Sequence, residues 1–250
     1  GVYVKVALCI SGQMRTFQEC YPSQYENLIL RFNPDVFVHT WSEQGYSVRE
    51  RPVLPSEISV SENLAETIET LYHPKKKVIE DFEASYTDSL HGVSVPEDLK
   101  LAEPLSYKGA IPMFYKIWAC HQLCLEYANE QGFEYDLVIR LRPDLYVDEP
   151  MDEIIGATED QHRLYLGHLT EVFASDRIAA GSQKSMTYYC SVWEKLQQYW
   201  QNSLQDGNKD NFLVGERLMR WHLKWSELDY LAMRALTHIK RYDQSINQIR

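Results

Sequence analysis

The feature that most constrains this chain is an apolar segment in its middle, residues 135–147, which carries charges where a buried strand would hold apolar side chains. Successive side chains of a strand point to opposite faces, so Arg140, Arg142 and Asp144 are expected to share one face. Unpaired charges in a buried strand are costly, so these must pair with one another, with a metal ion or with an anionic ligand. The end of this strand is therefore a candidate diphosphate site.

The chain has 250 residues and a formal net charge of -11, with no apolar stretch of transmembrane length. This length suits one α/β domain over residues 1–250. A nucleic-acid or anionic-membrane surface needs clustered cations, which this charge balance disfavours. We therefore expect no nucleic-acid partner and no membrane span, and any phosphate recognition must be local.

The five cysteines are odd in number and form no Cys-x-x-Cys pair, which favours reduced thiols. Cys120 and Cys124 are four residues apart beside His121, a spacing that suggests metal ligands, but free cysteine usually packs as a small hydrophobe and we expect packing here. No secretory leader opens the chain and no Asn-x-Ser/Thr sequon occurs. The prediction is a cytoplasmic protein.

Strand and helix patterns alternate along the chain, which predicts a layered α/β fold with parallel strands. Strands are predicted over 4–10, 34–41, 77–79, 135–141, 164–166 and 177–181. Helices are predicted over 18–32 with a true start near Tyr21 or Pro22, over 64–72 and 113–131, from 182 or 183 to 199, and over 212–223.

Residues 42–110 form a polar, proline-punctuated insertion, and its composition is least favourable to order over 83–108. Long irregular loops in compact domains are usually functional or disordered, so a lid, an acceptor-binding segment and disorder all stay open. Tyr86 and Tyr107 are candidates for stacking on sugar rings, or ordinary surface aromatics.

Polar residues follow the first predicted strand. Gly12 lets the backbone approach a ligand, Ser11 precedes it, and the guanidinium of Arg15 can fork onto phosphate. Ser-Gly after a strand is also common as a plain turn, so this signal is weak by itself.

Three further residues are candidates for donor binding. Trp41 ends the second strand and either stacks on a nucleobase or packs in the core. Tyr115 and Lys116 are placed in the first turns of a helix, where the macrodipole gives a lysine no benefit. Lys116 therefore either meets an anionic ligand or faces solvent.

For Arg140 and Arg142 the alternative to a diphosphate is a structural ion pair with Asp144, Asp136 or another acid. A diphosphate suits two guanidinium groups because planar forks match its oxygens. If the backbone stays extended, Asp144 and Asp148 are candidates to hold a divalent cation.

Six segments, taken in order along the chain, resemble those of a known protein family. They are Ser11-Gly-Gln-Met-Arg-Thr-Phe17, Asn33-Pro-Asp-Val-Phe-Val-His-Thr-Trp41, Met113-Phe-Tyr-Lys-Ile117, the strand Tyr135 to Asp144, Ala180-Gly-Ser-Gln-Lys-Ser-Met186 and Glu216-Arg-Leu-Met-Arg-Trp-His-Leu223. Together they resemble a little-characterised family of GT-A-type glycosyltransferases from bacteria and large viruses, over about residues 5–223.

The resemblance implies a Rossmann-like GT-A fold, with a mixed, mostly parallel sheet flanked by helices. It also implies a nucleotide-sugar donor and a glycan or other hydroxyl acceptor. Such enzymes generally place an Asp-x-Asp motif at a strand end to hold Mn²⁺ or Mg²⁺. In this chain Arg142-Pro143-Asp144 occupies the position of that motif. Either Asp144 alone anchors the metal, or the arginines replace it.

Sugar transfer builds negative charge on the departing diphosphate, so Arg142 and then Arg140 are the predicted electrophilic clamp. An inverting enzyme also needs a group that accepts the acceptor's proton. Asp176 is the first candidate, although a turn residue is the simpler interpretation. Glu216 and His222 come after it, and His222 fits a packed core histidine better.

Two other classes stay open. A sugar nucleotidyltransferase would use basic residues on a triphosphate, but its usual glycine- and lysine-rich first loop has a poor match in residues 11–15. A non-catalytic glycan-binding domain derived from a transferase is compatible with the missing Asp-x-Asp. The sequence does not name the sugar, the nucleotide, the acceptor, the stereochemistry or the oligomeric state.

Overall fold

The computed structural model describes residues 3–43, 63–102, 107–205 and 215–239. Within these ranges a seven-stranded sheet has the order β10-β8-β9-β6-β1-β2-β3. The strands are β1 (Val6–Ser11), β2 (Asp35–Trp41), β3 (Lys76–Glu80), β6 (Leu137–Leu141), β8 (Arg163–Leu166), β9 (Ile178–Gly181) and β10 (Asp229–Ala232).

The sheet is mixed and mostly parallel. Neighbouring strands pair in parallel except at β9, which is antiparallel to both β6 and β8. From β1 the chain runs outward through β2 and β3, then returns to place β6 on the other side of β1. The predicted fold class is confirmed, and the strand order reverses between β1 and β6.

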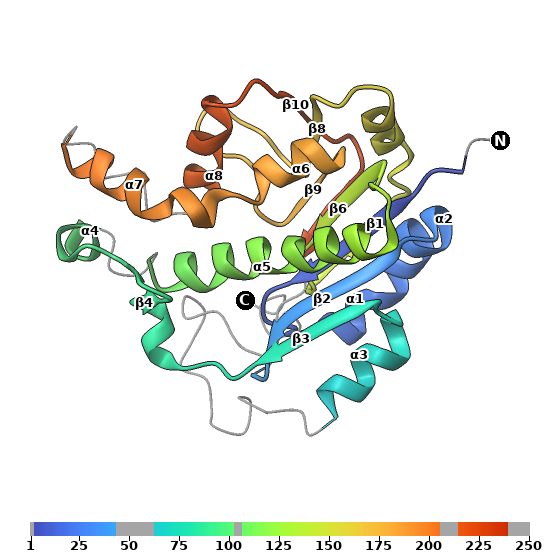
Figure 1. Ribbon diagram of the computed structural model, residues 1–250, viewed down its shortest axis with the longest axis horizontal. Helices are drawn as coiled ribbons and strands as arrows, with labels where there is room; N and C mark the ends of the chain where they lie inside the picture. The colour runs from blue at the N-terminus through green and yellow to red at the C-terminus, as the bar shows by residue number, and fades with distance from the viewer. Residues whose placement is uncertain (1–2, 44–62, 103–106, 206–214, 240–250) are drawn as a thin grey trace, which may run out of the picture.

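Helices cover both faces of the sheet (Figure 1). They are α1 (Phe17–Gln24), which continues through the π-helical turn Tyr25–Ile29 into α2 (Leu30–Phe32), then α3 (Leu64–Tyr72), α4 (Glu97–Ala102), α5 (Tyr107–Gln131), α6 (Gln183–Tyr189), α7 (Val192–Gln205) and α8 (Gly215–Lys224). One buried apolar cluster contains the sheet face under α5, and a second contains the opposite face under α1 and α3. Burial on both faces explains why the central strands read as nearly continuous apolar runs.

The segment 135–147 is two strands, which corrects the prediction of one charged strand face. β6 ends at Leu141, a turn follows at Pro143 and Asp144, and β7 (Leu145–Val147) pairs antiparallel with β11 (Thr237–Ile239) in a separate ribbon. Proline lacks the N–H that a central strand would need, so the ladder ends there. The period-two argument therefore stops at Leu141, before Arg142 and Asp144.

Three helix predictions also need correction. The first helix begins at Phe17 and carries Pro22 inside it, and α5 begins six residues before Met113, with Pro112 inside it. The predicted helix 182–199 is two helices, α6 and α7, although Ser182 does cap α6 by accepting a hydrogen bond from the Ser185 N–H at 3.0 Å. In α1 and α5, tertiary packing outweighs the tendency of proline to end a helix.

The described parts of the 42–110 insertion contain regular structure, contrary to the low order predicted over 83–108. They include β3, a 3₁₀ turn at Ala84–Thr87, the two-stranded ribbon of β4 (Ser89–Leu90) and β5 (Val93–Ser94), and α4. Residues 44–62 and 103–106 lie outside the described residues, as does the side chain of Tyr107.

All five cysteines are buried and free, as predicted. Among the helices that the structure describes, none combines the length and apolarity needed to cross a bilayer.

Candidate active site at the carboxyl ends of β1 and β6

The predicted phosphate-binding residues gather where β1 and β6 end. These strands are parallel neighbours, paired from Val6 with Leu137 to Ile10 with Leu141, so their carboxyl ends lie side by side. Ligands of open α/β sheets bind at the carboxyl edge where strand order reverses, which is this point.

The turn after β1 depends on its glycine. Gly12 has φ of +111°, its N–H donates to the His39 carbonyl at 3.2 Å, and its own carbonyl accepts from Thr40 Oγ1 at 2.6 Å. Arg15 follows with φ of +44°, a left-handed conformation that non-glycine residues adopt at a cost. This backbone brings Arg15 Nη1 to 3.6 Å from Asp144 Oδ2.

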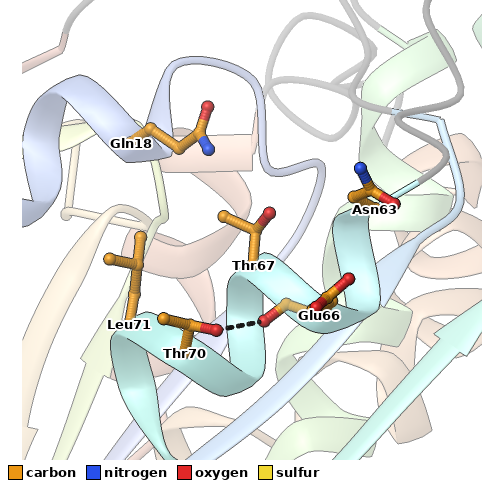
Figure 2. A pocket seen from close by; sticks show the side chains of 6 residues that line it. All are labelled: Gln18, Asn63, Glu66, Thr67, Thr70 and Leu71. Carbon is orange, nitrogen blue, oxygen red and sulfur yellow. Dashed lines mark hydrogen bonds between the residues drawn. The ribbon is translucent and has the colours of Figure 1, made fainter.

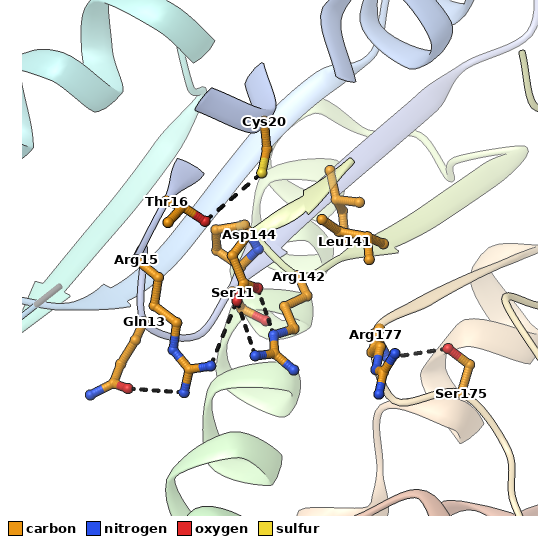
Figure 3. A network of polar contacts seen from close by, with 12 residues as sticks. Ser11, Gln13, Arg15, Thr16, Cys20, Leu141, Arg142, Asp144, Ser175 and Arg177 are labelled. Carbon is orange, nitrogen blue, oxygen red and sulfur yellow. Dashed lines mark hydrogen bonds and ion pairs between the residues drawn. The ribbon is translucent and has the colours of Figure 1, made fainter. Parts of the chain in front are cut away.

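Arg142 and Asp144 form a bidentate pair (Figure 3). Arg142 Nε donates to Asp144 Oδ1 at 2.6 Å and Nη2 to Oδ2 at 3.0 Å. The Asp144 side chain is 1% exposed, while those of Arg142 and Arg15 are 22% and 20% exposed. A buried carboxylate thus fixes the orientation of a guanidinium that solvent and ligands can reach.

These contacts do not suit a metal ion at Asp144. Both of its oxygens already accept hydrogen bonds from Arg142, and the second neighbour, Arg15, is also a cation. Asp148 is bound elsewhere, to His238 Nδ1 at 2.6 Å beyond the turn. Within the described segments, neither aspartate belongs to a group of three metal-ligating side chains.

Arg140 lies inside the protein rather than beside Arg142. It is 2% exposed, and its Nη1 donates to the carbonyls of Ser11 at 2.9 Å and Leu141 at 2.7 Å, while its Nε has no hydrogen-bond partner. Burial lowers the pKa of its guanidinium. Arg140 therefore stabilises the end of β1 through the Ser11 carbonyl. The prediction that Arg140 and Arg142 share one strand face is wrong, because β6 ends at Leu141, between them.

Asp176 lies at the same edge, just before β9. It is 8% exposed, and its pKa is raised by burial and by the charge of Glu216 against the opposing effect of Arg142. A Cβ added to Gly215, the first residue of α8, would lie 2.6 Å from Asp176 Oδ2, so the start of the helix packs closely against this carboxylate.

Glu216 lies near Asp176 in a different environment. Its Oε1 is 3.3 Å from both Arg177 Nε and His168 Nε2. Burial raises the pKa of Glu216, but His168, Arg177 and Arg142 outweigh it and leave the pKa lowered. The two neighbouring acids are thus pushed apart in pKa.

Lys116 is neither solvent-facing nor aimed at a ligand. Its ammonium donates to His39 Nδ1 at 2.9 Å, to the Thr40 carbonyl at 2.9 Å and to Glu80 Oε1 at 3.0 Å, which uses all three of its protons. Because α5 starts at Tyr107, Lys116 lies in its third turn and not near its positive end. The solvent-facing interpretation of Lys116 is therefore wrong, and its donors are already taken by protein groups.

The aromatic candidates beside Lys116 are packed as well. Trp41 is 1% exposed, and the Lys116 ammonium lies 3.7 Å from its ring centroid. Tyr115 donates to Glu80 Oε1 at 2.9 Å. The alternative of Trp41 as a core residue therefore fits better than an open stacking face.

His222 is a core histidine, the interpretation favoured from sequence. It is fully buried, stacks on Tyr188 and lies 2.6 Å from the Tyr199 hydroxyl through Nδ1. Burial lowers its pKa to about 4. Tyr86 is half-buried and packs against Trp41, so it is not a freely exposed loop tyrosine.

Sequence reasoning missed Glu80, Arg177 and His168. Glu80 ends an edge strand and His168 follows β8, so both had the strand-end position that identified Arg142. Arg177 precedes β9, which reaches the same edge because it runs antiparallel to β6. Their partners come from segments far away in the chain, and no short motif marks them.

A shallow depression of about 430 Å³ lies between α1 and α3 (Figure 2). It is lined by Gln18, Asn63, Glu66, Thr67, Thr70 and Leu71. None of these is a predicted site residue and none is a cation, so the depression offers nothing to hold a diphosphate.

No family model matches the chain, and no curated protein matches it. Among solved structures it is similar to the crystal structure of mouse xyloside xylosyltransferase 1 in its apo form, with 11% sequence identity and a TM-score of 0.44. The match covers 92% of this chain and 84% of the other. A likeness this slight supports no inference about activity.

Proposed function

We propose that the protein is a glycosyltransferase that moves a sugar from a nucleotide-sugar donor to a glycan or other hydroxyl acceptor. The observation that carries the proposal is the Arg142 guanidinium, partly exposed at the strand-order reversal and locked by a buried carboxylate. The sequence resemblance to GT-A-type glycosyltransferases also supports it.

Arg142 acts on the leaving group in this proposal. Negative charge grows on the diphosphate as its bond to the sugar breaks, and a guanidinium fork matches phosphate oxygens. A cation already fixed in place stabilises the transition state without having to reorganise. Asp144 is a positioning residue because it touches Arg142 and is too buried to reach the substrate itself.

The clamp works without a metal at Asp144. A divalent cation there would have to displace Arg142 from both carboxylate oxygens and sit beside Arg15. Of the two alternatives left by the sequence, replacement of the metal by arginine fits the contacts, and the diphosphate takes its charge compensation from guanidinium groups.

Asp176 is the proposed proton acceptor for the incoming hydroxyl. Its raised pKa makes it a stronger base than an ordinary aspartate, and the lowered pKa of Glu216 keeps that neighbour ionised. Pairs of acids with pKa values pushed apart are typical of acid-base sites.

Thermal-shift titration with UDP, GDP, CMP and ATP, each with and without added Mn²⁺, tests this function. One nucleoside diphosphate or monophosphate should stabilise the chain by about 2.7 kcal/mol at about 100 times its Kd, with no requirement for Mn²⁺.

The matched control is Arg163→Ala, which removes a partly exposed arginine that is paired with Asp229. Both residues begin their strands, β8 and β10, and so lie at the edge of the sheet opposite the candidate site. It should keep the shift that Arg142→Ala loses. Stabilisation by ATP alone would favour the nucleotidyltransferase alternative. No shift with any nucleotide, together with a shift from a glycan panel, would favour the glycan-binding domain.

A further inference from the structure

A second group of reactive side chains lies inside the protein, between β1 and α5. Cys9 of β1 and His121 and Cys124 of α5 place one sulfur or ring nitrogen each within 4.8 Å of the others. They are 3%, 1% and 0% exposed. His121 and Cys124 are three apart on a helix and so share a face, while Cys9 comes from a strand more than a hundred residues earlier.

The hydrogen bonds of His121 determine which ring nitrogen is free. Thr187 Oγ1 donates its only proton to the Gln183 carbonyl at 2.7 Å, so it must accept in its 2.8 Å contact with His121 Nε2. Nε2 therefore carries the ring proton. Nδ1 is left with a bare lone pair, and it has no hydrogen-bond partner.

A buried acceptor without a partner is unfavourable, because it has lost its hydrogen bonds to water without gaining others. The His121 ring is grouped with two thiol sulfurs, and imidazole plus thiolate is the ligand set that zinc prefers. A metal-bound histidine usually donates its other ring N–H to an oxygen, as His121 does to Thr187. The orphaned nitrogen thus has both the ligands and the outer-shell contact of a metal site.

The surroundings can also take the charge of such a site. Zn²⁺ would displace the thiol protons of Cys9 and Cys124, which leave to solvent, so that two thiolates balance the ion. Cys9 is the direct register partner of Arg140, whose buried guanidinium would offset an excess negative charge.

We propose that Cys9, His121 and Cys124 bind a structural zinc ion that ties β1 to α5. No ligand of this group is open to solvent, so the role is structural rather than catalytic. Cys9 lies two residues before Ser11, so the zinc ion would stabilise the end of β1, near Arg15 and Arg142.

The test is metal content by mass spectrometry of the full chain, purified from zinc-supplemented culture under reducing conditions. Wild type should carry about one zinc per chain, and Cys124→Ser should fall to background. Cys20→Ser is the matched control, since Cys20 is equally buried but lies on α1 outside the group, and it should keep the zinc.

Thr187→Val keeps the test valid if Cys124→Ser fails to fold. Thr187 is exposed and not a ligand, so the variant should fold while binding zinc about 10–100-fold more weakly. In the metal-free wild type, added Co²⁺ should give a thiolate-to-cobalt charge-transfer band. The proposal is overturned by wild type without zinc, by equal zinc in Cys124→Ser and wild type, or by a Cys9–Cys124 disulfide in the purified protein. These readouts do not depend on glycosyltransferase activity.

Discussion

Two cations at the same edge of the sheet have opposite surroundings. At the ends of β1 and β6, Arg142 is 22% exposed and shares its carboxylate partner with Arg15. At the ends of β2 and β3, Lys116 is fully buried, and Glu80, His39 and Thr40 use all three of its protons.

A cation at a strand end is therefore not by itself a ligand site. Guanidinium keeps donors to spare after one bidentate pair, because it has five N–H groups, whereas the ammonium of Lys116 has none left. The arginine can therefore serve a ligand while the lysine holds β2, β3 and α5 together.

The largest expected difference between the two regions is in kcat. Arg142→Ala should lower kcat about 10²–10³-fold, since it removes a preplaced cation from the leaving group. Lys116→Met should cost far less, because that charge is already neutralised by Glu80. Both are measured with labelled donor well below each variant's melting temperature.

Arg142→Lys provides the control for charge alone. It keeps the cation but loses the fork, so an intermediate rate is expected. Wild-type turnover in Arg142→Ala would exclude the proposed role, and equal losses in the arginine and lysine variants would remove the distinction between the two regions.

The next effect is on folding. Glu80→Ala should lower the free energy of unfolding by about 2 kcal/mol, because Lys116 is left as a buried cation without its anionic partner. The loss should be smaller than for a fully buried pair, since the Glu80 side chain is 31% exposed. Urea unfolding monitored by tryptophan fluorescence measures it.

Glu69→Ala is the matched control for that measurement. Glu69 pairs with Lys77 across the surface, with 53% of its side chain exposed, and its loss should change stability by at most about 1 kcal/mol. If the two variants lose equal stability, the Lys116 pair is no stronger than a surface pair.

The smallest effect is a pH dependence. Burial lowers the pKa of Lys116 from 10.5 to about 8, so between these values the folded state binds fewer protons than the unfolded state. The free energy of unfolding should therefore rise with pH across this window, by at most about 1.4 kcal/mol per pH unit from this residue. Lys116→Met should lack that contribution in urea titrations from pH 7 to 10, and parallel curves for the two proteins would contradict it.

Local patterns in the sequence were sufficient for most of the sheet. Apolar runs identified β1, β2, β6 and β9, and the predicted helix start at Ser182 or Gln183 was correct, because these depend on residues near one another in the chain. β10 and β11 were missed because they are only partly buried and therefore carry no apolar run, and each is fixed by pairing with a strand far away in the chain.

Residue patterns along the chain were enough to predict a mostly parallel sheet with charges at the ends of its strands. Which of those charges a ligand can reach depends on the folded structure. It buried Arg140 and Lys116, paired Arg142 with Asp144, and brought Cys9 to His121 and Cys124. Burial and ion pairing depend on groups that meet across the fold, and the energy of a charge depends on those neighbours rather than on its place in the chain.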